Sequence, residues 1–290
     1  MRFIRGHERE FRIKTMCEVL EVSRAGYYAW KKRGPSLRSQ ADRLLVRQIW
    51  AVFVENRKVY GSPRIHMALR RQGLCLSRKR VARLMRENRI VAEPYRRMKW
   101  KRPYKTAEAA NDLVQRRFHV PEPNRIWAAD MTAFWSGSGW VHLAVVMDLY
   151  SRRIVGWAMH GQMTERLVVN ALDMAILSRR PRGSLIHHSD QGSQYKSHLF
   201  RSKLQENGIR LSMGAKGNCW DNAVVESFFK TLKVELQNDE RFKTRKDAKA
   251  ELFEYIEVFY NRKRMHSTLG YLSPAQFESN LSSLVSTKAG

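Results

Sequence analysis

The chain has 290 residues, and its 43% hydrophobic content and eight tryptophans are enough to build substantial cores, which excludes a disordered polycation. Its apolar runs are too short to cross a membrane, its first ten residues hold no signal-peptide core, and its three scattered cysteines predict reduced thiols in the cytoplasm. The formal net charge is +27, and residues 1–120 carry 31 lysines and arginines against 10 acidic residues. This imbalance favours nucleic acid as the partner, although ribosomal-type and membrane-surface proteins share it.

The first 35 residues predict two short helices around a tight break. Ile13, Met16, Cys17 and Leu20 form an apolar stripe, and Ser23 is placed to cap a second helix that ends before Gly34. Such a pair is typical of a helix-turn-helix motif, and it is equally common in plain helical bundles.

Residues 36–94 predict a second helical region that contacts DNA. One helix is expected from Ser39 to Val54, a second begins with Ser62 as N-cap before Pro63, and a third runs from Ser77 to about Asn88. The third helix is strongly basic, and its charged residues have almost no acidic partners nearby in the sequence. We expect it to lie against DNA rather than to be an ordinary solvated face, through Arg78, Lys79, Arg80, Arg83 and Arg86.

Residues 95–120 form a basic linker without periodicity, and an α/β domain is expected over 121–280, followed by a tail at 281–290. Three successive β-type runs from residue 125 to 160 predict an antiparallel meander. A helix (164–178), a short strand (SLIHHS), a helix (195–207), a possible strand (IRLSM) and an amphipathic helix within 217–236 follow.

Three carboxylates occupy positions suited to chemistry in this domain. Asp130 lies near the end of the first strand, Asp190 directly follows the fourth, and Glu226 comes 35 residues later on the amphipathic helix. Magnesium prefers such hard oxygen ligands, and a pair of ions can assist phosphoryl transfer. Taken alone, a strand-end Asp more often closes a turn, as we expect of Asp148, and Glu226 more often forms a surface ion pair with Lys230.

Four motifs carry a resemblance that changes this balance: WAADMT, HHSDQGSQY, GNCWDNAVVESFFKTLKVE and YNRKRMHSTLGYLSPAQF. In this order and spacing they resemble the second-frame transposases of the insertion-sequence-three family, within the retroviral-integrase superfamily. The resemblance implies an RNase H-like α/β core with a mixed five-stranded sheet, preceded by a small all-α helix-turn-helix-type region. It also implies that Asp130, Asp190 and Glu226 form a catalytic, metal-binding DDE triad.

The same resemblance implies further roles for residues around the triad. Lys230 and Lys233 are expected to touch the DNA of the element end, with Arg262, Lys263 and Arg264 as further DNA contacts. Gln191 and Asn222 are expected to shape the site. The cofactor is expected to be Mg²⁺ or Mn²⁺, as two ions.

The expected activity is therefore DNA cleavage and strand transfer at the ends of an insertion sequence, by a dimer or larger assembly on DNA. The resemblance also implies a separate upstream-frame helix-turn-helix protein as a partner, which would supply the leucine-zipper heptads that the N-terminal residues of this sequence lack. Two alternatives remain open at this point: a nuclease of the same fold, and a DNA-binding regulator with little activity of its own.

Overall fold

The computed structural model describes residues 1–92, 120–214, 223–236 and 242–286, the last six without their side chains. The linker expected at 95–120, apart from its last residue, and Asn222 lie outside these ranges. Within them, no helix is both long enough and apolar enough to span a bilayer.

The N-terminal segment folds as three short helices: α1 (Arg2–Gly6), α2 (Ile13–Val19) and α3 (Arg24–Lys32). The two helices predicted from the sequence are present, and the Ser23 hydroxyl caps α3 by accepting from the Gly26 N–H at 2.9 Å. The sequence pattern missed α1, whose single buried residue, Ile4, packs on Met16, Cys17 and Tyr27. One apolar residue in a five-residue helix is too little to produce a periodic signal.

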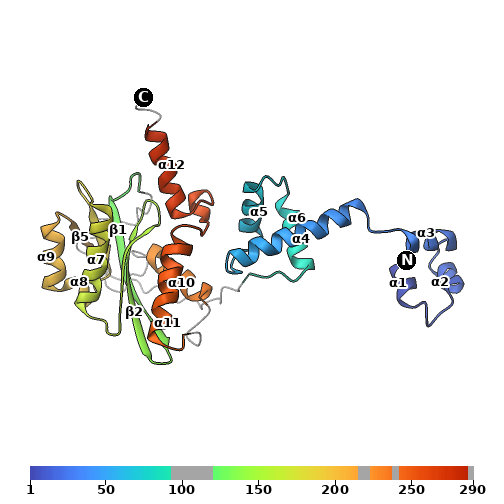
Figure 1. The fold of residues 1–290 in the computed structure, drawn as a ribbon, viewed down its shortest axis with the longest axis horizontal. Coiled ribbons are helices and arrows are strands. Elements are labelled where there is room, and N and C mark those ends of the chain that lie inside the picture. Colours follow the sequence, from blue (N-terminus) through green and yellow to red (C-terminus); the bar gives the residue numbers. More distant parts are fainter. Residues whose placement is uncertain (93–119, 215–222, 237–241, 287–290) are drawn as a thin grey trace.

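The second helical region consists of α4 (Leu37–Glu55), α5 (Ser62–Arg71) and α6 (Arg78–Glu87), which Figure 1 shows between the N-terminal helices and the sheet domain. Ser77 caps α6 as predicted, since its hydroxyl accepts from the Arg80 N–H at 3.2 Å. Ser62 was expected to cap α5, but Gly61 holds the N-cap position and Ser62 is the first helical residue. The first turn therefore starts one residue earlier, with Pro63 still inside it.

The sheet has five strands: β1 (Ile126–Ser136), β2 (Gly139–Asp148), β3 (Ile154–His160), β4 (Ile186–Ser189) and β5 (Arg210–Met213). Their order is β3-β2-β1-β4-β5. The first three pair antiparallel, which confirms the predicted meander, and β4 and β5 add in parallel to β1. The mixed five-stranded sheet expected from the resemblance is thus confirmed.

Helices cover both faces of the sheet (Figure 1). One face carries α7 (Glu165–Arg179), α8 (Ser193–Lys196) and α9 (His198–Glu206), and the other carries α10 (Ala223–Glu235), α11 (Arg245–Phe253) and the π-helical turn η2 (Glu254–Tyr260). The single helix expected at 195–207 is broken at Ser197, which caps α9 by accepting from the Phe200 N–H at 3.3 Å. Each face has its own apolar cluster, and α10 lies over β1.

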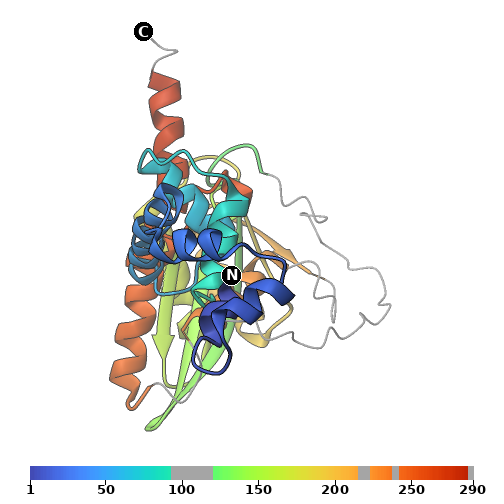
Figure 2. The ribbon, with the colours of Figure 1, turned by 90° about the vertical axis from the view of Figure 1, so that its right-hand side faces the viewer.

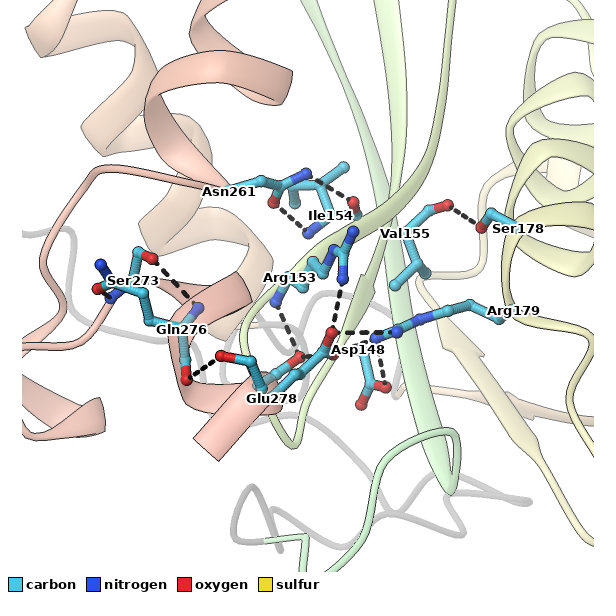
Figure 3. Close-up of polar contacts among 12 residues, drawn as sticks. Asp148, Arg153, Ile154, Val155, Ser178, Arg179, Asn261, Ser273, Gln276 and Glu278 are labelled. Carbon is cyan, nitrogen blue, oxygen red and sulfur yellow. Dashed lines mark hydrogen bonds and ion pairs between the residues drawn. The ribbon is translucent and has the colours of Figure 1, made fainter. Parts of the chain in front are cut away.

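The chain ends with the 3₁₀ turn η3 (Ser267–Leu269) and α12 (Pro274–Ser286), which projects away from the core in both ribbon views (Figures 1 and 2). The helix continues past position 280, where the sequence analysis placed the start of a tail. Its base is anchored to the turn between β2 and β3, because Glu278 accepts from Ser151 and Arg153, each at 2.7 Å, and pairs with Arg179 (Figure 3).

Asp148 belongs to this anchoring network and not to the metal-candidate group. It is fully buried, and its carboxylate accepts from the backbone N–H groups of Asn124 at 2.9 Å and Tyr150 at 3.0 Å. The Arg179 guanidinium lies 3.4 Å from the same carboxylate (Figure 3). Burial raises its pKa, while these N–H groups and Arg179 oppose that rise. The turn-closing role expected for Asp148 is confirmed.

The α4–α6 region docks on the sheet domain through the loop between α4 and α5. The Tyr60 hydroxyl accepts from the Met265 N–H at 2.8 Å, and Arg57 pairs with Glu254 and, at 3.2 Å, with Glu251. One continuous apolar cluster runs from α4 to η2. The helical region is therefore held against the α10 side of the sheet domain.

Candidate active site

Asp130 lies on β1, on the face of the sheet that α10 covers. Side chains alternate between the two faces along a strand, and Asp130 is an even number of positions from Ala128 and Phe134. These two residues belong to the apolar cluster under α10, so Asp130 lies on the same face. Its side chain is half-buried, and Oδ1 accepts from the Met131 N–H at 2.7 Å. The strand therefore holds a carboxylate at the edge of an apolar layer, where its charge is poorly solvated.

Asp190 lies beside Asp130 because β4 runs parallel to β1. Ala128 pairs with His188, so continuing both strands by two residues brings the two aspartates level. Asp190 is exposed, and its Oδ1 accepts from the Gly192 N–H at 3.0 Å. Gln191, expected to shape the site, bonds the Gly214 carbonyl at 3.1 Å and so ties this loop to the end of β5.

Glu226 projects from the exposed side of α10. Four apolar residues of this helix (Val225, Phe228, Phe229 and Leu232) are buried, so the predicted apolar face of the helix is present. Glu226, Lys230 and Lys233 are exposed at spacings of four and three, along one edge of the helix. Within the described residues Glu226 forms no ion pair, and the Lys233 ammonium lies 5.7 Å from the centre of the Phe134 ring on β1. The surface ion pair between Glu226 and Lys230, which the sequence also allowed, is not formed.

Electrostatics link the three carboxylates. The pKa of Asp130 is raised to about 7, first by burial and then by the negative charges of Asp190 and Glu226, against the Met131 N–H and Lys233. Partial desolvation also raises the pKa of Glu226. The charges of Asp190 and Glu226 thus act on Asp130 from separate elements, and a bound cation would relieve their repulsion of the Asp130 carboxylate.

A tyrosine that the sequence analysis did not single out lies beneath this group. Tyr195, in the motif DQGSQY, is buried, and its hydroxyl has no hydrogen-bond partner among the described residues. Burial raises its pKa well above the usual value, and the charges of Asp130 and Asp190 raise it further. The sequence feature that could have indicated Tyr195 is an aromatic residue five positions after Asp190. A sequence pattern does not show, however, whether such a side chain is buried.

The donors fit a hard divalent cation such as Mg²⁺ or Mn²⁺, because all three are carboxylates and Asp130 is already destabilised as a charge. Among the described residues, however, no three His, Cys, Asp or Glu side chains stand close enough together to hold one ion. Asp130 and Asp190 would hold it from adjacent strands, and Glu226 would have to approach them.

Some basic residues of α6 are paired with acidic side chains, and others are exposed. Asp42 of α4 pairs with Arg80 at 2.6 Å and with Arg83 at 2.7 Å, and Arg83 also pairs with Glu87. The expectation that this helix lacks acidic partners was therefore wrong for these two arginines, since the partner comes from a neighbouring helix 38 and 41 positions away. Three further residues of α6 are exposed: Arg78, Lys79 and Arg86.

The basic motif after η2 also divides into exposed and buried members. Arg262 and Lys263 are exposed. Arg264 is only 3% exposed and donates to both oxygens of Glu235, at 2.8 and 2.6 Å. The structure contradicts the expected DNA contact of Arg264, because its guanidinium is held inside the core by a buried carboxylate.

Models of known protein families match most of this chain, including the residues of the candidate site. An HTH-like domain matches residues 39–99, and two models described as integrase core domain match 120–219 and 226–281. Among solved structures, the chain is similar to the HTLV-2 integrase catalytic core domain in complex with magnesium, at 16% identity over 53% of this chain and 96% of that one, with a TM-score of 0.40. The fold and the family models define a protein of the integrase-core class.

The curated relatives are more specific. The chain is 42% identical over 269 residues to the insertion element IS600 uncharacterized 31 kDa protein of Shigella sonnei, covering 90% of this chain and 97% of that protein. It is 41% identical over 280 residues to the transposase InsF for insertion sequence IS3A of Escherichia coli, covering 95% and 97%. The chain belongs to the IS3 family of insertion-sequence transposases.

Proposed function

We propose that this chain catalyses metal-dependent DNA cleavage and strand transfer at the ends of an insertion sequence, with Asp130, Asp190 and Glu226 as its catalytic carboxylates. The observation that carries the proposal is the pairing of β1 with β4, which brings Asp130 and Asp190 level, and the charge of Glu226 on α10 is near enough to help raise the pKa of Asp130. Strongly perturbed carboxylates gathered from separate elements are typical of functional sites.

Each of the three carboxylates would bind the metal from a different element of the fold. Asp130 would hold Mg²⁺ or Mn²⁺ from the middle of β1, Asp190 from the loop directly after β4, and Glu226 would complete the ligand set from α10. Two ions, when bound, polarise the scissile phosphate and stabilise charge on the attacking and leaving oxygens. The buried apolar residues of α10 hold Glu226 on the same side of the sheet as Asp130, and the hydrogen bond from Gln191 to the Gly214 carbonyl ties down the loop that carries Asp190.

The exposed basic residues hold the DNA on both sides of these carboxylates. Lys230 and Lys233 follow Glu226 along α10 and contact the strand being cut, and Arg262 and Lys263 extend this surface. The exposed residues of α6 (Arg78, Lys79 and Arg86) bind the DNA of the element end. Asn222 is proposed to shape the site as well, although it lies outside the described residues.

The reaction has two steps at each element end. Water first cleaves a phosphodiester and releases a 3′-hydroxyl. That hydroxyl then attacks another phosphodiester, forming a new P–O bond and displacing the 3′-oxygen of the attacked strand as a hydroxyl. No covalent enzyme intermediate forms, because the nucleophiles are water and DNA. Two ends must be brought together, so the working form is a dimer or larger assembly on DNA in the bacterial cytoplasm, assisted by an upstream-frame helix-turn-helix protein.

A strand-transfer assay on pre-cleaved element ends with a free 3′-hydroxyl tests the proposal. Glu226→Gln and Asp190→Asn should each lower joining in Mg²⁺ or Mn²⁺ by about a thousandfold or more while end binding stays within a few-fold of wild type. Glu206→Gln, exposed on α9 across the sheet, is the matched control and should join ends normally.

The same assay separates the two alternatives. Nicked but unjoined products from the wild-type chain would indicate a nuclease. If the chain binds ends but produces neither nicks nor joined strands, even beside its upstream partner, a DNA-binding regulator is the correct function.

A further inference from the structure

A groove of about 690 Å³ lies along β5, at the end of the sheet domain farthest from the α4–α6 region (Figure 1). Its walls come from α8, from α9, from the turn between α9 and β5, and from β5 itself. Gln191, the residue after Asp190, also lines this β5 groove. The groove therefore begins beside a catalytic carboxylate, although none of the three carboxylates proposed to bind the metal lines it.

The charged side chains that line the β5 groove, among the described residues, are all basic: Lys196 of α8, Arg201 of α9 and Arg210 of β5. All three are exposed. None of them forms an ion pair within the described part of the chain, whereas the neighbouring Lys203 pairs with Asp173 at 2.9 Å. The groove therefore gathers positive charge from three separate elements.

The outer edge of β5 adds backbone donors to the groove. Among the described residues β5 pairs with β4 alone, so its other edge is open. The Arg210 N–H donates to the Leu185 carbonyl, on the β4 side, at 2.9 Å. Because successive N–H groups of a strand point to opposite edges, those of Leu211 and Met213 point to the open edge, and both residues line the groove. Backbone N–H groups of this kind can donate to phosphate oxygens.

Lys196 and Arg210 lie at opposite ends of the groove. The Lys196 ammonium donates to Oε1 of Gln191 at 3.2 Å, and the Gln191 amide donates to the carbonyl of Gly214, directly after β5, at 3.1 Å. Arg210 is the first of the four residues of β5. An extended strand of this length measures about 13 Å. The two basic residues are therefore anchored farther apart than one phosphate group spans.

A DNA strand carries one phosphate per roughly 3.4 Å of helix axis, so several of its phosphates fit along this groove. Strand transfer brings two DNA segments to the same carboxylates, and the exposed basic residues of α6 and α10 are assigned to the element end. Neither of these helices lines the β5 groove. We propose that the β5 groove binds the sugar-phosphate backbone of the second segment, the target DNA. The inference rests on the function proposed above, and element-end DNA, which has the same backbone chemistry, is distinguished from target DNA by experiment.

The first experiment measures joining of a pre-cleaved element end to a separate target duplex as the target concentration is raised. The full chain is compared with Arg201→Gln, Arg210→Gln and the control Lys203→Gln, which removes one charge from α9 outside the groove. Loss of one charge-assisted phosphate contact should raise the target concentration for half-maximal joining about fivefold or more in each groove variant, but less than about twofold in the control. Element-end binding, element-end cleavage and the melting temperature should be the same in all four proteins, because both arginines are exposed.

Element-end binding tells the two sources of DNA apart. If the groove variants lose affinity for the element end as much as for the target, the groove holds the element end and the assignment to target DNA is wrong. If their joining depends on target concentration as that of Lys203→Gln does, the groove does not hold target DNA and the proposal is also wrong.

A second experiment requires no catalysis and separates the groove from the proposed function. A duplex lacking the element end is titrated, over a range of salt concentrations, into the chain already bound to element-end DNA. Each groove variant should bind this duplex several-fold more weakly than Lys203→Gln, and its salt dependence should fall by about one counterion. A wild-type chain that joins nothing but shows this difference overturns the catalytic function alone. If it joins nothing and the difference does not appear, both proposals are wrong.

Discussion

The buried ion pair between Glu235 and Arg264 gives the most direct prediction of stability. Glu235 is 3% exposed, and its two oxygens accept from Nε and Nη2 of Arg264, at 2.8 and 2.6 Å, and from the Tyr255 hydroxyl at 2.7 Å. Glu235→Gln keeps the shape of the side chain but removes its charge. The guanidinium then loses the charge of Glu235 and lies beside an amide N–H₂ that cannot accept a hydrogen bond from it.

The cost follows from this geometry. Breaking a buried pair by removing one partner is typically worth about 3–5 kcal/mol, because the remaining charge stays desolvated. Domains of this size lose roughly 2–4 °C in melting temperature per kcal/mol, so Glu235→Gln should melt at least 6 °C below wild type. Replacing both residues by apolar ones, Glu235→Leu with Arg264→Met, should recover more than half of the loss.

Thermal and urea unfolding, followed by tryptophan fluorescence and circular dichroism, measure this loss. Glu251→Gln is the matched control: its carboxylate side chain is 41% exposed and 3.2 Å from Arg57, and such surface pairs contribute about 0–1 kcal/mol. If Glu235→Gln costs no more than Glu251→Gln, the guanidinium of Arg264 is not held by Glu235, and the expected DNA contact of Arg264 becomes tenable again.

The other predictions concern charge and packing elsewhere in the chain. Because burial and the neighbouring carboxylates raise the pKa of Asp130 from 3.8 to about 7 on folding, its contribution to stability is complete below about pH 3.8 and is lost as the pH rises to about 7. The stability advantage of metal-free Asp130→Asn over wild type should therefore grow by about 2–3 kcal/mol between pH 5 and pH 8 in urea unfolding; an advantage that does not change with pH would contradict this. Gly156→Ala should cost about 3 kcal/mol or more, since a Cβ there would lie 2.1 Å from the Ala171 carbonyl oxygen, whereas Gly34→Ala, with open space around it, should cost little. Asp42→Asn should release its two arginines on α6 and tighten DNA binding a few-fold at low salt, an effect that disappears in high salt; unchanged binding would show that α6 does not contact DNA.

The sequence by itself determined the order and type of most elements and the chemical character of the site. Alternation of apolar residues predicted the meander, spacings of three and four predicted α10 with its apolar face, and capping serines marked the starts of α3 and α6. These features are local, because a strand, an amphipathic helix or an N-cap is specified by residues a few positions apart. The motifs around Asp130, Asp190 and Glu226 also indicated the family, which the relatives confirm.

Only the tertiary structure decided which basic side chains are exposed and which are buried or paired with a carboxylate. Arg264 and Arg262 stand in one basic motif, but one is buried against Glu235 and the other is exposed. Arg80 and Arg83 are paired by a carboxylate from another helix, and the hydrogen bond between Tyr60 and Met265 joins residues 205 positions apart. Burial and counter-ions depend on how distant elements pack, and a pattern of neighbouring residues does not contain that information.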